Sequence, residues 1–296
     1  MRTILNVLWL VLSGLWLALG YAVAGIVMCL LIVTIPFGGP PLTRAVLAGD
    51  APATWCERAP VDTKSWARRA TTTRDDASVR DWATVLEPAL QASGAAAERL
   101  ARSAAGKGVV VTTGQQPGLF GGPVYTWSKA LSALALADAL EREIGIPVAP
   151  VFWAATYDAD FAESSASYVI LNGNLLHLQQ PPPERADLSM RDTPLGTDTT
   201  LIRSLELASG SAVAHSALEA VREAYRPEQT VGLAYVQLLR TILEPLGIAV
   251  LDAGHPAVRR ASRPFLGTAL ARATEIDTAL VARERELLAR GFAPPV

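Results

Sequence analysis

The chain has 296 residues, which is enough for one large domain or for two ordinary ones. Half of the residues are hydrophobic and the formal net charge is only −2, so there is no basic excess typical of a nucleic-acid-binding surface and no acidic tail. We therefore expect no nucleic-acid partner. Cys29 and Cys56 lie far apart and lack the clustered spacing of a metal site, and two cysteines make no disulfide framework.

An uncharged apolar run covers residues 4–37. One membrane crossing needs roughly 20 apolar residues, so this run is long for one crossing and short for two. A secretory signal has a much shorter apolar region of about 7–15 residues. Gly20-Tyr21 could turn a tight hairpin, and Arg2 and Arg44 flank the run, which favours a membrane hairpin with both ends in the cytoplasm. A hairpin buried in a protein core is the alternative.

The same run resembles a known family. The stretches RTILNVLWLVLSGLWLALGY and VMCLLIVTIPFG are similar to the opening of small bacterial inner-membrane proteins of the YccF type. In that family an Asn-x-Leu-Trp start and an Ile-Pro-Phe-Gly finish bracket a membrane hairpin. The resemblance covers about residues 2–38 and implies an inner-membrane location, with the remainder of the chain in the cytoplasm.

Residues 39–106 are rich in Ala, Arg, Asp, Thr and Pro, and prolines keep the first part irregular. The pattern predicts two helices after that, over 78–91 and 95–105. Both are typical of solvent-exposed helices that cover a core. We interpret 39–106 as a linker followed by covering helices.

From residue 107 the sequence predicts an α/β domain. Residues 109–113 read as a buried strand, residues 123–143 as a helix and residues 148–153 as a second buried strand, which is the pattern of a parallel crossover unit. A third buried strand is predicted over 248–252, directly after Gly247. In parallel sheets of this kind, ligands bind at the carboxyl ends of the strands.

The segments between the second and third strands are less regular. Two short strands, SYVIL and LLHLQ, flank Asn172-Gly173, which predicts a β-hairpin. A polar loop is expected up to about Thr200, and helices are expected near 212–225 and 227–246. From about Ala257 the pattern is helical and becomes charged toward its end.

The stretch TTGQQPGLFGGP at residues 112–123 joins the first strand to the following helix. Its glycines permit positive φ angles and a close approach of a ligand, and a helix amino terminus favours an anion. It is neither a Walker loop nor a G-x-G-x-x-G fingerprint, so a plain tight corner is the alternative. Lys129 lies two helical turns later in an otherwise apolar segment, and its ammonium is expected to lean back toward the glycines. The alternative is a lysine that extends to water.

Three carboxylates follow the second strand, at Asp158, Asp160 and Glu163. They could bind a substrate amine, hold magnesium or act as a general base, and Asp158 and Asp160 would share one face of an extended chain. A solvated acidic loop is the alternative. The histidines, which are His177, His215 and His255, are scattered, and we interpret them as structural or exposed.

The sequence from VVVTTGQQPGLFGGPVYTWSK to FWAATYDADFAE is similar to the BshC family of cysteine-adding enzymes of bacillithiol biosynthesis. The family motif Thr-Gly-Gln-Gln-x-Gly-Leu-x-x-Gly-Pro-x-Tyr-Thr-x-x-Lys matches Thr113 through Lys129 position for position. The resemblance covers roughly residues 60–296. It implies a Rossmann-like core related to class I aminoacyl-tRNA synthetases, with inserted segments and a following coiled coil. It also implies the joining of cysteine to the amino group of glucosaminyl malate, with ATP activating the cysteine carboxyl.

The resemblance also implies roles for particular residues. Lys129, Asp158 and Asp160 are the catalytic candidates. The substrate- and nucleotide-binding candidates are Thr113, Gly114, Gln115, Gln116, Gly118, Gly121, Gly122, Tyr125 and Glu163. Family members commonly carry Glu-Asp-His-Asp where this chain has Tyr157, Asp158, Ala159 and Asp160, so roles of the missing glutamate and histidine cannot be transferred.

We therefore expect four parts: a membrane hairpin over 1–38, a linker with covering helices over 39–106, a Rossmann-like ligase core over 107–255, and the helical start of a truncated C-terminal region over 256–296. The expected cofactors are ATP and, as an option, magnesium. The expected partners are cysteine, glucosaminyl malate, the membrane and a second copy of the chain. The alternatives are a non-catalytic membrane-anchored binding module, and a fusion or gene-model artefact without activity.

Overall fold

The computed structural model describes residues 45–46, 48–52, 55, 60, 62–75, 81–106, 108–185, 187–196, 200–210 and 215–292. The predicted membrane hairpin over 4–37 lies outside these residues. Within the described part, no helix combines the length and the apolar character that a membrane crossing needs. The chain divides into two compact units, Pro60–Ala271 and Met1–Ala59 with Arg272–Val296, which we describe separately.

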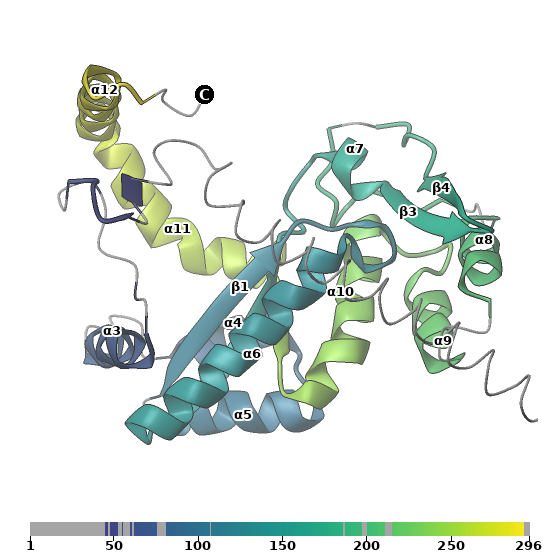
Figure 1. Ribbon diagram of the computed structural model, residues 1–296, viewed down its shortest axis with the longest axis horizontal. Helices are drawn as coiled ribbons and strands as arrows, with labels where there is room; N and C mark the ends of the chain where they lie inside the picture. Colours follow the sequence, from purple (N-terminus) through teal and green to yellow (C-terminus); the bar gives the residue numbers. More distant parts are fainter. Residues whose placement is uncertain are drawn as a thin grey trace, which may run out of the picture. The chain divides into compact units, whose positions relative to one another are not determined.

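A three-stranded parallel sheet forms the centre of the larger unit (Figure 1). Its strands are β1 (Val109–Gln115), β2 (Val148–Ala154) and β5 (Ala249–Asp252), in the order β1-β2-β5. Six of the seven residues of β2 and all four of β5 are buried, as expected for the β-branched and apolar runs that predicted these strands. The predicted α/β fold with a parallel sheet is confirmed, and β1 continues two residues beyond its predicted end.

Helices cover both faces of this sheet. On one face lie α6 (Val124–Ile144) and α10 (Val231–Leu243), which pack on Phe152 and Val250. Figure 1 shows α6 running in front of β1. Because successive side chains of a strand point to opposite faces, Val151 instead faces the second layer. That layer consists of the helices α4 (Trp82–Leu90) and α5 (Gly94–Ala105).

A third helix, α3 (Thr63–Asp75), packs through Ala70 against Val109 and against Leu140 of α6. It was not predicted. The segment is polar on most of its surface and contains only a short apolar stripe, so its helical periodicity is weak. It extends the apolar core at the amino end of the sheet.

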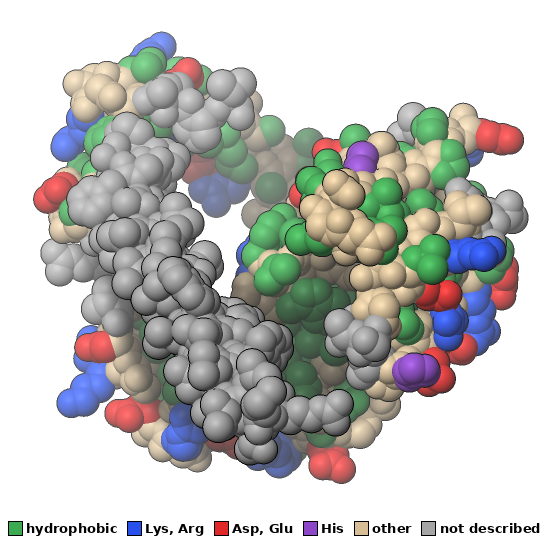
Figure 2. Space-filling model, turned by 45° about the vertical axis from the view of Figure 1, so that its right-hand side comes forward, with side chains coloured by type: hydrophobic (Ala, Val, Ile, Leu, Met, Phe, Trp, Pro, Cys, Tyr) green, Lys and Arg blue, Asp and Glu red, His purple; other side chains and the backbone are tan. Residues whose placement is uncertain are grey.

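The predicted hairpin is confirmed as β3 (Ala166–Leu171) paired antiparallel with β4 (Asn174–Gln179). Asn172 and Gly173 have φ angles of 52° and 77°. Positive φ at both central residues is the geometry of the two-residue turn that an Asn-Gly pair favours. Large apolar side chains remain on the outer face of the hairpin, and Figure 2 shows hydrophobic side chains reaching the surface on this side.

Two helices, α8 (Thr200–Ser209) and α9 (His215–Ala224), pack with the inner face of the hairpin around Leu178. The helix α8 was not predicted, because the preceding polar loop was expected to reach Thr200 and the next helix was expected only near residue 212. The helix predicted over 227–246 begins later, as α10, since the Thr230 hydroxyl accepts a hydrogen bond from the Leu233 amide and caps it. It ends in a short 3-10 turn, η2 (Glu244–Leu246).

The helix α11 (Pro256–Ala271) closes the larger unit, and α12 (Ala273–Ala289) belongs to the smaller one. The helical pattern predicted from Ala257 is therefore confirmed. In the smaller unit, Trp55 packs edge-on against Phe292 with 5.9 Å between ring centroids, and the Arg290 guanidinium lies 5.1 Å from the Trp55 ring centroid.

Candidate functional site

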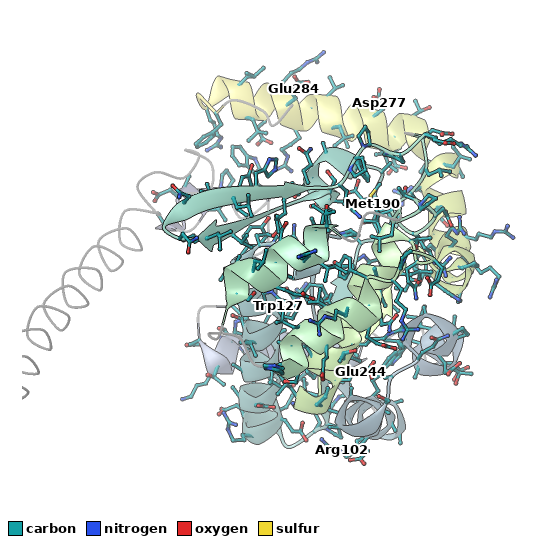
Figure 3. The ribbon with its side chains drawn as sticks, turned by 90° about the vertical axis from the view of Figure 1, so that its right-hand side faces the viewer. Arg102, Trp127, Met190, Glu244, Asp277 and Glu284 are labelled. Carbon is teal, nitrogen blue, oxygen red and sulfur yellow. The ribbon has the colours of Figure 1, made fainter. Side chains whose placement is uncertain are left out.

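The glycine-rich corner follows β1 directly. After Gln115 the chain turns through Gly118 into the 3-10 turn η1 (Leu119–Gly121) and then enters α6. A Cβ atom on Gly118 would lie 2.6 Å from the Cα atom of Gly122, and one on Gly121 would lie 2.4 Å from Cζ2 of Trp127, a side chain labelled in Figure 3. Both contacts are too short for a side chain, so the corner requires glycine at these positions.

The amino end of α6 is open to solvent. Pro123 is the residue before the first helical turn, with φ −70° and ψ 159°, rather than the first helical residue as predicted. The amide groups of Val124 and Tyr125 donate no hydrogen bond within the part of the chain that the structure describes. Val124 is 84% exposed. Unpaired amides and the positive end of the helix dipole together suit an anion.

Lys129 reaches back to this corner. Its Nζ atom lies 2.8 Å from Oε1 of Gln115 and 3.5 Å from the carbonyl oxygen of Gly114. It also lies 5.1 Å from the centroid of the Tyr125 ring. The predicted approach of the Lys129 ammonium to the corner is confirmed, and the side chain remains exposed to solvent. Its catalytic role stays a prediction.

Hydrogen bonds extend from Lys129 through Gln115 to Gln116. The Gln115 amide nitrogen donates to Oε1 of Gln116 at 3.2 Å and approaches the Tyr125 hydroxyl at 3.5 Å. The Gln116 side chain lies beside the Asp158 carboxylate and contributes to the lowering of its pKa. The structure therefore brings together the two groups of candidate residues that the sequence presented separately.

Asp158 also stabilises its own loop. Its Oδ1 atom accepts a hydrogen bond from the Asp160 amide at 3.0 Å. This backbone hydrogen bond, followed by the contact with Gln116, lowers the pKa of Asp158 below its ordinary value and outweighs partial burial, which acts in the opposite direction. Asp158 is therefore ionised at neutral pH and is a weak base.

The other two carboxylates do not converge with Asp158. Oδ1 of Asp160 accepts from the Glu163 amide at 3.0 Å and caps the short helix α7 (Phe161–Ser164), which was not predicted. The Glu163 side chain is exposed. Asp158 and Asp160 thus lie in consecutive turns rather than on one face of an extended strand. Among the described residues, no three His, Cys, Asp or Glu side chains gather as a metal-binding set.

A buried ion pair lies at the same edge of the sheet and was missed by sequence reasoning. Asp252, the last residue of β5, is 3% exposed, and its Oδ2 atom lies 2.8 Å from Nε of Arg191. The Thr156 hydroxyl donates to Oδ1 of Asp252 and accepts from the Gly254 amide at 2.8 Å. Burial, followed by the charge of Arg191, lowers the pKa of the adjacent His255. The sequence offered one signal for this ion pair, an aspartate at the end of a buried strand. Its partner Arg191, however, lies 61 residues away along the chain.

The backbone around Arg191 ties this ion pair to the candidate carboxylate. The Arg191 amide donates to the Thr156 carbonyl oxygen at 2.8 Å, and the Met190 amide donates to the Asp158 carbonyl oxygen at 2.7 Å. Met190 is 1% exposed and is labelled in Figure 3. The loop that carries Asp158 is therefore held on one side by Asp252 and Arg191.

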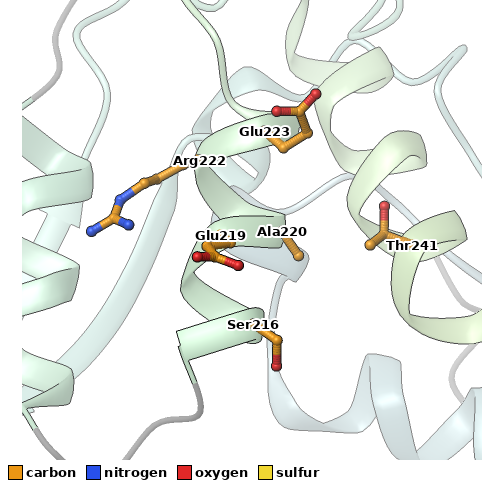
Figure 4. A pocket seen from close by; sticks show the side chains of 6 residues that line it. All are labelled: Ser216, Glu219, Ala220, Arg222, Glu223 and Thr241. Atoms are coloured by element: carbon orange, nitrogen blue, oxygen red, sulfur yellow. The ribbon is translucent and has the colours of Figure 1, made fainter.

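Other polar features serve the fold. Glu244 is buried at the amino end of β5, accepts from the Ser93 amide and hydroxyl at 3.1 and 2.6 Å, and is labelled well below Met190 in Figure 3. A groove of about 610 Å³ lies between α9 and α10 (Figure 4). In it Arg222 pairs with Glu206 at 2.6 Å and Glu223 pairs with Arg226, so these charges are already neutralised by neighbours.

Comparison with known proteins agrees with this architecture. Residues 56–296 match the family model described as "Bacillithiol biosynthesis BshC, N-terminal Rossmann-like domain". The chain belongs to the BshC family. A second family model, the inner membrane component domain YccF, matches residues 4–39.

Several curated BshC relatives have names that describe them as cysteine ligases. The relative from Geobacillus thermodenitrificans is 27% identical over 76% of this chain and 42% of its own length. The relative from Solibacter usitatus is 34% identical over 70% of this chain and 39% of its own length, and that from Koribacter versatilis is 34% identical over 66% and 36%. The chain thus spans about two fifths of the length of the BshC relatives that it matches.

Proposed function

We propose that this chain is the Rossmann-like part of a cysteine ligase that joins cysteine to the amino group of glucosaminyl malate. The observation that carries the proposal is the contact of the Lys129 ammonium with Gln115 and Gly114 at the glycine-rich corner, where Gln116 lies beside Asp158. A cation and an ionised carboxylate would then flank the open amino end of α6, at the carboxyl edge of a parallel sheet. The names of the BshC relatives support the same reaction class.

Different residues of the corner would bind different chemical groups of the substrates. A phosphate or carboxylate would lie against the amides of Val124 and Tyr125, and Lys129 would neutralise its charge. The side-chain amides of Gln115 and Gln116 would orient polar substrate groups. Asp158, with its lowered pKa, suits the ammonium of an amino acid better than it suits the role of a general base near neutral pH.

ATP would supply the activation of the cysteine carboxyl as an adenylate, by analogy with class I aminoacyl-tRNA synthetases. Its phosphates have the charge that the corner fits. Magnesium stays an expectation that depends on ATP, because this ion usually binds through one or two carboxylates together with substrate phosphates. The remaining binding candidates, Thr113, Gly114, Gly118, Gly121, Gly122 and Glu163, stay predictions that depend on this assignment.

The test is an ATP- and cysteine-dependent coupling assay with glucosaminyl malate, run on the complete 296-residue chain together with equilibrium binding of ATP. Lys129→Ala should weaken ATP binding by about tenfold or more, since it removes a charged hydrogen-bond donor. Lys64→Ala is the matched control, because Lys64 is exposed on α3 and contacts no candidate residue. Equal ATP affinities of the two variants would contradict the site assignment.

A non-catalytic membrane-anchored binding module is the second candidate. Binding of ATP or cysteine that depends on Lys129, without any amide product, would support this second candidate over the ligase.

We further propose that residues 4–37 anchor the chain in the inner membrane as a hairpin, with the ligase part in the cytoplasm. The match of residues 4–39 to the inner membrane component domain supports this. After alkaline extraction of membranes, the full chain should stay in the membrane fraction and a chain of residues 39–296 should be released. Recovery of the full chain entirely in the soluble fraction would refute the anchor.

The division of the chain into four parts, with boundaries at residues 38, 106 and 255, is also proposed, on the basis of the sequence pattern and the two family resemblances. A homodimer is proposed as well. The helical start of a truncated coiled-coil region over 256–296 is proposed from the family resemblance.

A further inference from the structure

A buried tyrosine lies directly beneath the glycine-rich corner. Tyr225, the residue that follows α9, is 5% exposed. Its hydroxyl donates to the carbonyl oxygen of Gly118 at 3.1 Å and lies 3.4 Å from the amide nitrogen of Gly121, which donates to it. These two backbone groups stand at the beginning and the end of η1. One side chain from a distant helix therefore bridges both ends of the turn.

The residue between these contacts has an unfavourable backbone conformation. Phe120 has φ 57° and ψ 34°, a left-handed conformation that residues with a Cβ atom rarely adopt. Its ring lies edge-on to the Tyr225 ring, with 5.1 Å between centroids and an interplanar angle of 61°. Such a conformation persists only where its surroundings hold it. Here the Tyr225 ring and hydroxyl contact the turn, in addition to the backbone hydrogen bond from the Gly121 amide to the Gly118 carbonyl oxygen at 3.1 Å.

A second buried tyrosine provides a natural comparison. Tyr235 of α10 is fully buried, like Tyr225, and α10 also packs on η1. Its hydroxyl faces Thr126 in the first turn of α6, but no hydrogen bond of good geometry joins the two groups. Burial raises the pKa of both tyrosines, so both are neutral phenols at physiological pH. Only the Tyr225 hydroxyl is bonded to the corner.

We propose that Tyr225 is a positioning residue for the anion site at the amino end of α6, acting through the backbone of η1. Its hydroxyl fixes the carbonyl of Gly118 and the amide of Gly121, and its ring holds Phe120. With η1 fixed, the chain enters α6 at an angle that leaves the amides of Val124 and Tyr125 facing solvent. The inference rests on the proposed function for the identity of the anion, but the contact between Tyr225 and the corner stands independently of it.

The removal of a single oxygen atom tests this role. In Tyr225→Phe the turn loses its bridge while the volume of the core is almost unchanged. In Tyr235→Phe an equally buried hydroxyl is lost from the neighbouring helix, with no bond to the corner. Amide hydrogen exchange of residues 118–122 reports on the corner without any ligand, and calorimetric titration with pyrophosphate reports on the anion site.

We expect exchange at residues 118–122 to accelerate in Tyr225→Phe by about tenfold, the factor set by one buried hydrogen bond, and pyrophosphate affinity to fall by a similar factor. Tyr235→Phe should leave both quantities within about twofold of the unsubstituted chain, even if its thermal unfolding midpoint changes, which separates positioning from general stability. Equal exchange and equal affinity in the two variants would overturn the proposal.

Two further outcomes are informative. If the unsubstituted chain binds no pyrophosphate, the proposed function fails, while the exchange comparison still decides whether Tyr225 holds the corner. If Tyr225→Phe does not fold, Phe120→Leu removes the ring contact and retains the hydroxyl. It should accelerate exchange and weaken pyrophosphate binding in the same direction, and unchanged behaviour would overturn the proposal.

Discussion

The ion pair between Arg191 and Asp252 gives a quantitative prediction about burial. Asp252→Asn keeps the size of the side chain and an acceptor for Thr156, but it leaves the Arg191 guanidinium without its partner. Breaking a buried pair in this way costs about 3–5 kcal/mol. Because the Arg191 side chain is 21% exposed and can recruit some water, we expect the lower end, about 3 kcal/mol.

The same chain offers a matched control. Arg185 and Asp187 form an ion pair with the same 2.8 Å separation, but their side chains are 65% and 71% exposed. Exposed ion pairs contribute about 0–1 kcal/mol to the free energy of unfolding, so Asp187→Asn should change stability very little. For a unit of this size, the thermal unfolding midpoint should fall by roughly 6–12 °C in Asp252→Asn and by at most about 4 °C in Asp187→Asn. Equal shifts would refute the reasoning that burial, rather than separation, determines the contribution.

Two other predictions concern the candidate site. Because the pKa of Asp158 is lowered in the folded chain, its contribution to stability is present above the ordinary carboxyl pKa and is lost as the pH falls through the lower folded value. Unfolding measured between about pH 2 and 5 should therefore show a weaker acid dependence in Asp158→Asn, and an unchanged acid dependence would contradict the assignment. Gly118→Ala should disrupt the corner and weaken pyrophosphate binding, since its Cβ atom would meet Gly122. Gly267→Ala is the control, because the space around Gly267 in α11 is open. It should leave binding unchanged and stabilise the helix by about 0.5–1 kcal/mol. Calorimetric titration of both variants checks this.

The sequence predicted the sheet because the signals for its strands are local. Val109–Val111 and the run after Pro147 are apolar and bounded by turn residues, and such runs form buried strands wherever they pack. The approach of Lys129 to the corner was also predictable, because a helical side chain leans toward the helix amino terminus.

The remaining features depend on contacts that no local pattern reveals. Arg191 and Asp252 meet only because β5 and the loop after β4 converge at one edge of the sheet, and Tyr225 reaches the corner from 107 residues away. The expectation that Asp158 and Asp160 share one face of an extended chain was wrong for a different reason. Short carboxylates compete for nearby backbone amides, and here each accepts a hydrogen bond from an amide of its own turn.

The hydrogen bonds through the two adjacent glutamines also run in a defined donor-to-acceptor direction. Lys129 can only donate, so the Gln115 amide must present its oxygen to the lysine and its nitrogen to Oε1 of Gln116. A half-turn of the Gln115 amide would set donor against donor and acceptor against acceptor. A glutamate at position 115 would face the oxygen of Gln116 with a second oxygen. Gln115 and Gln116 therefore act as one polarised unit, whose orientation is fixed by the charge of Lys129.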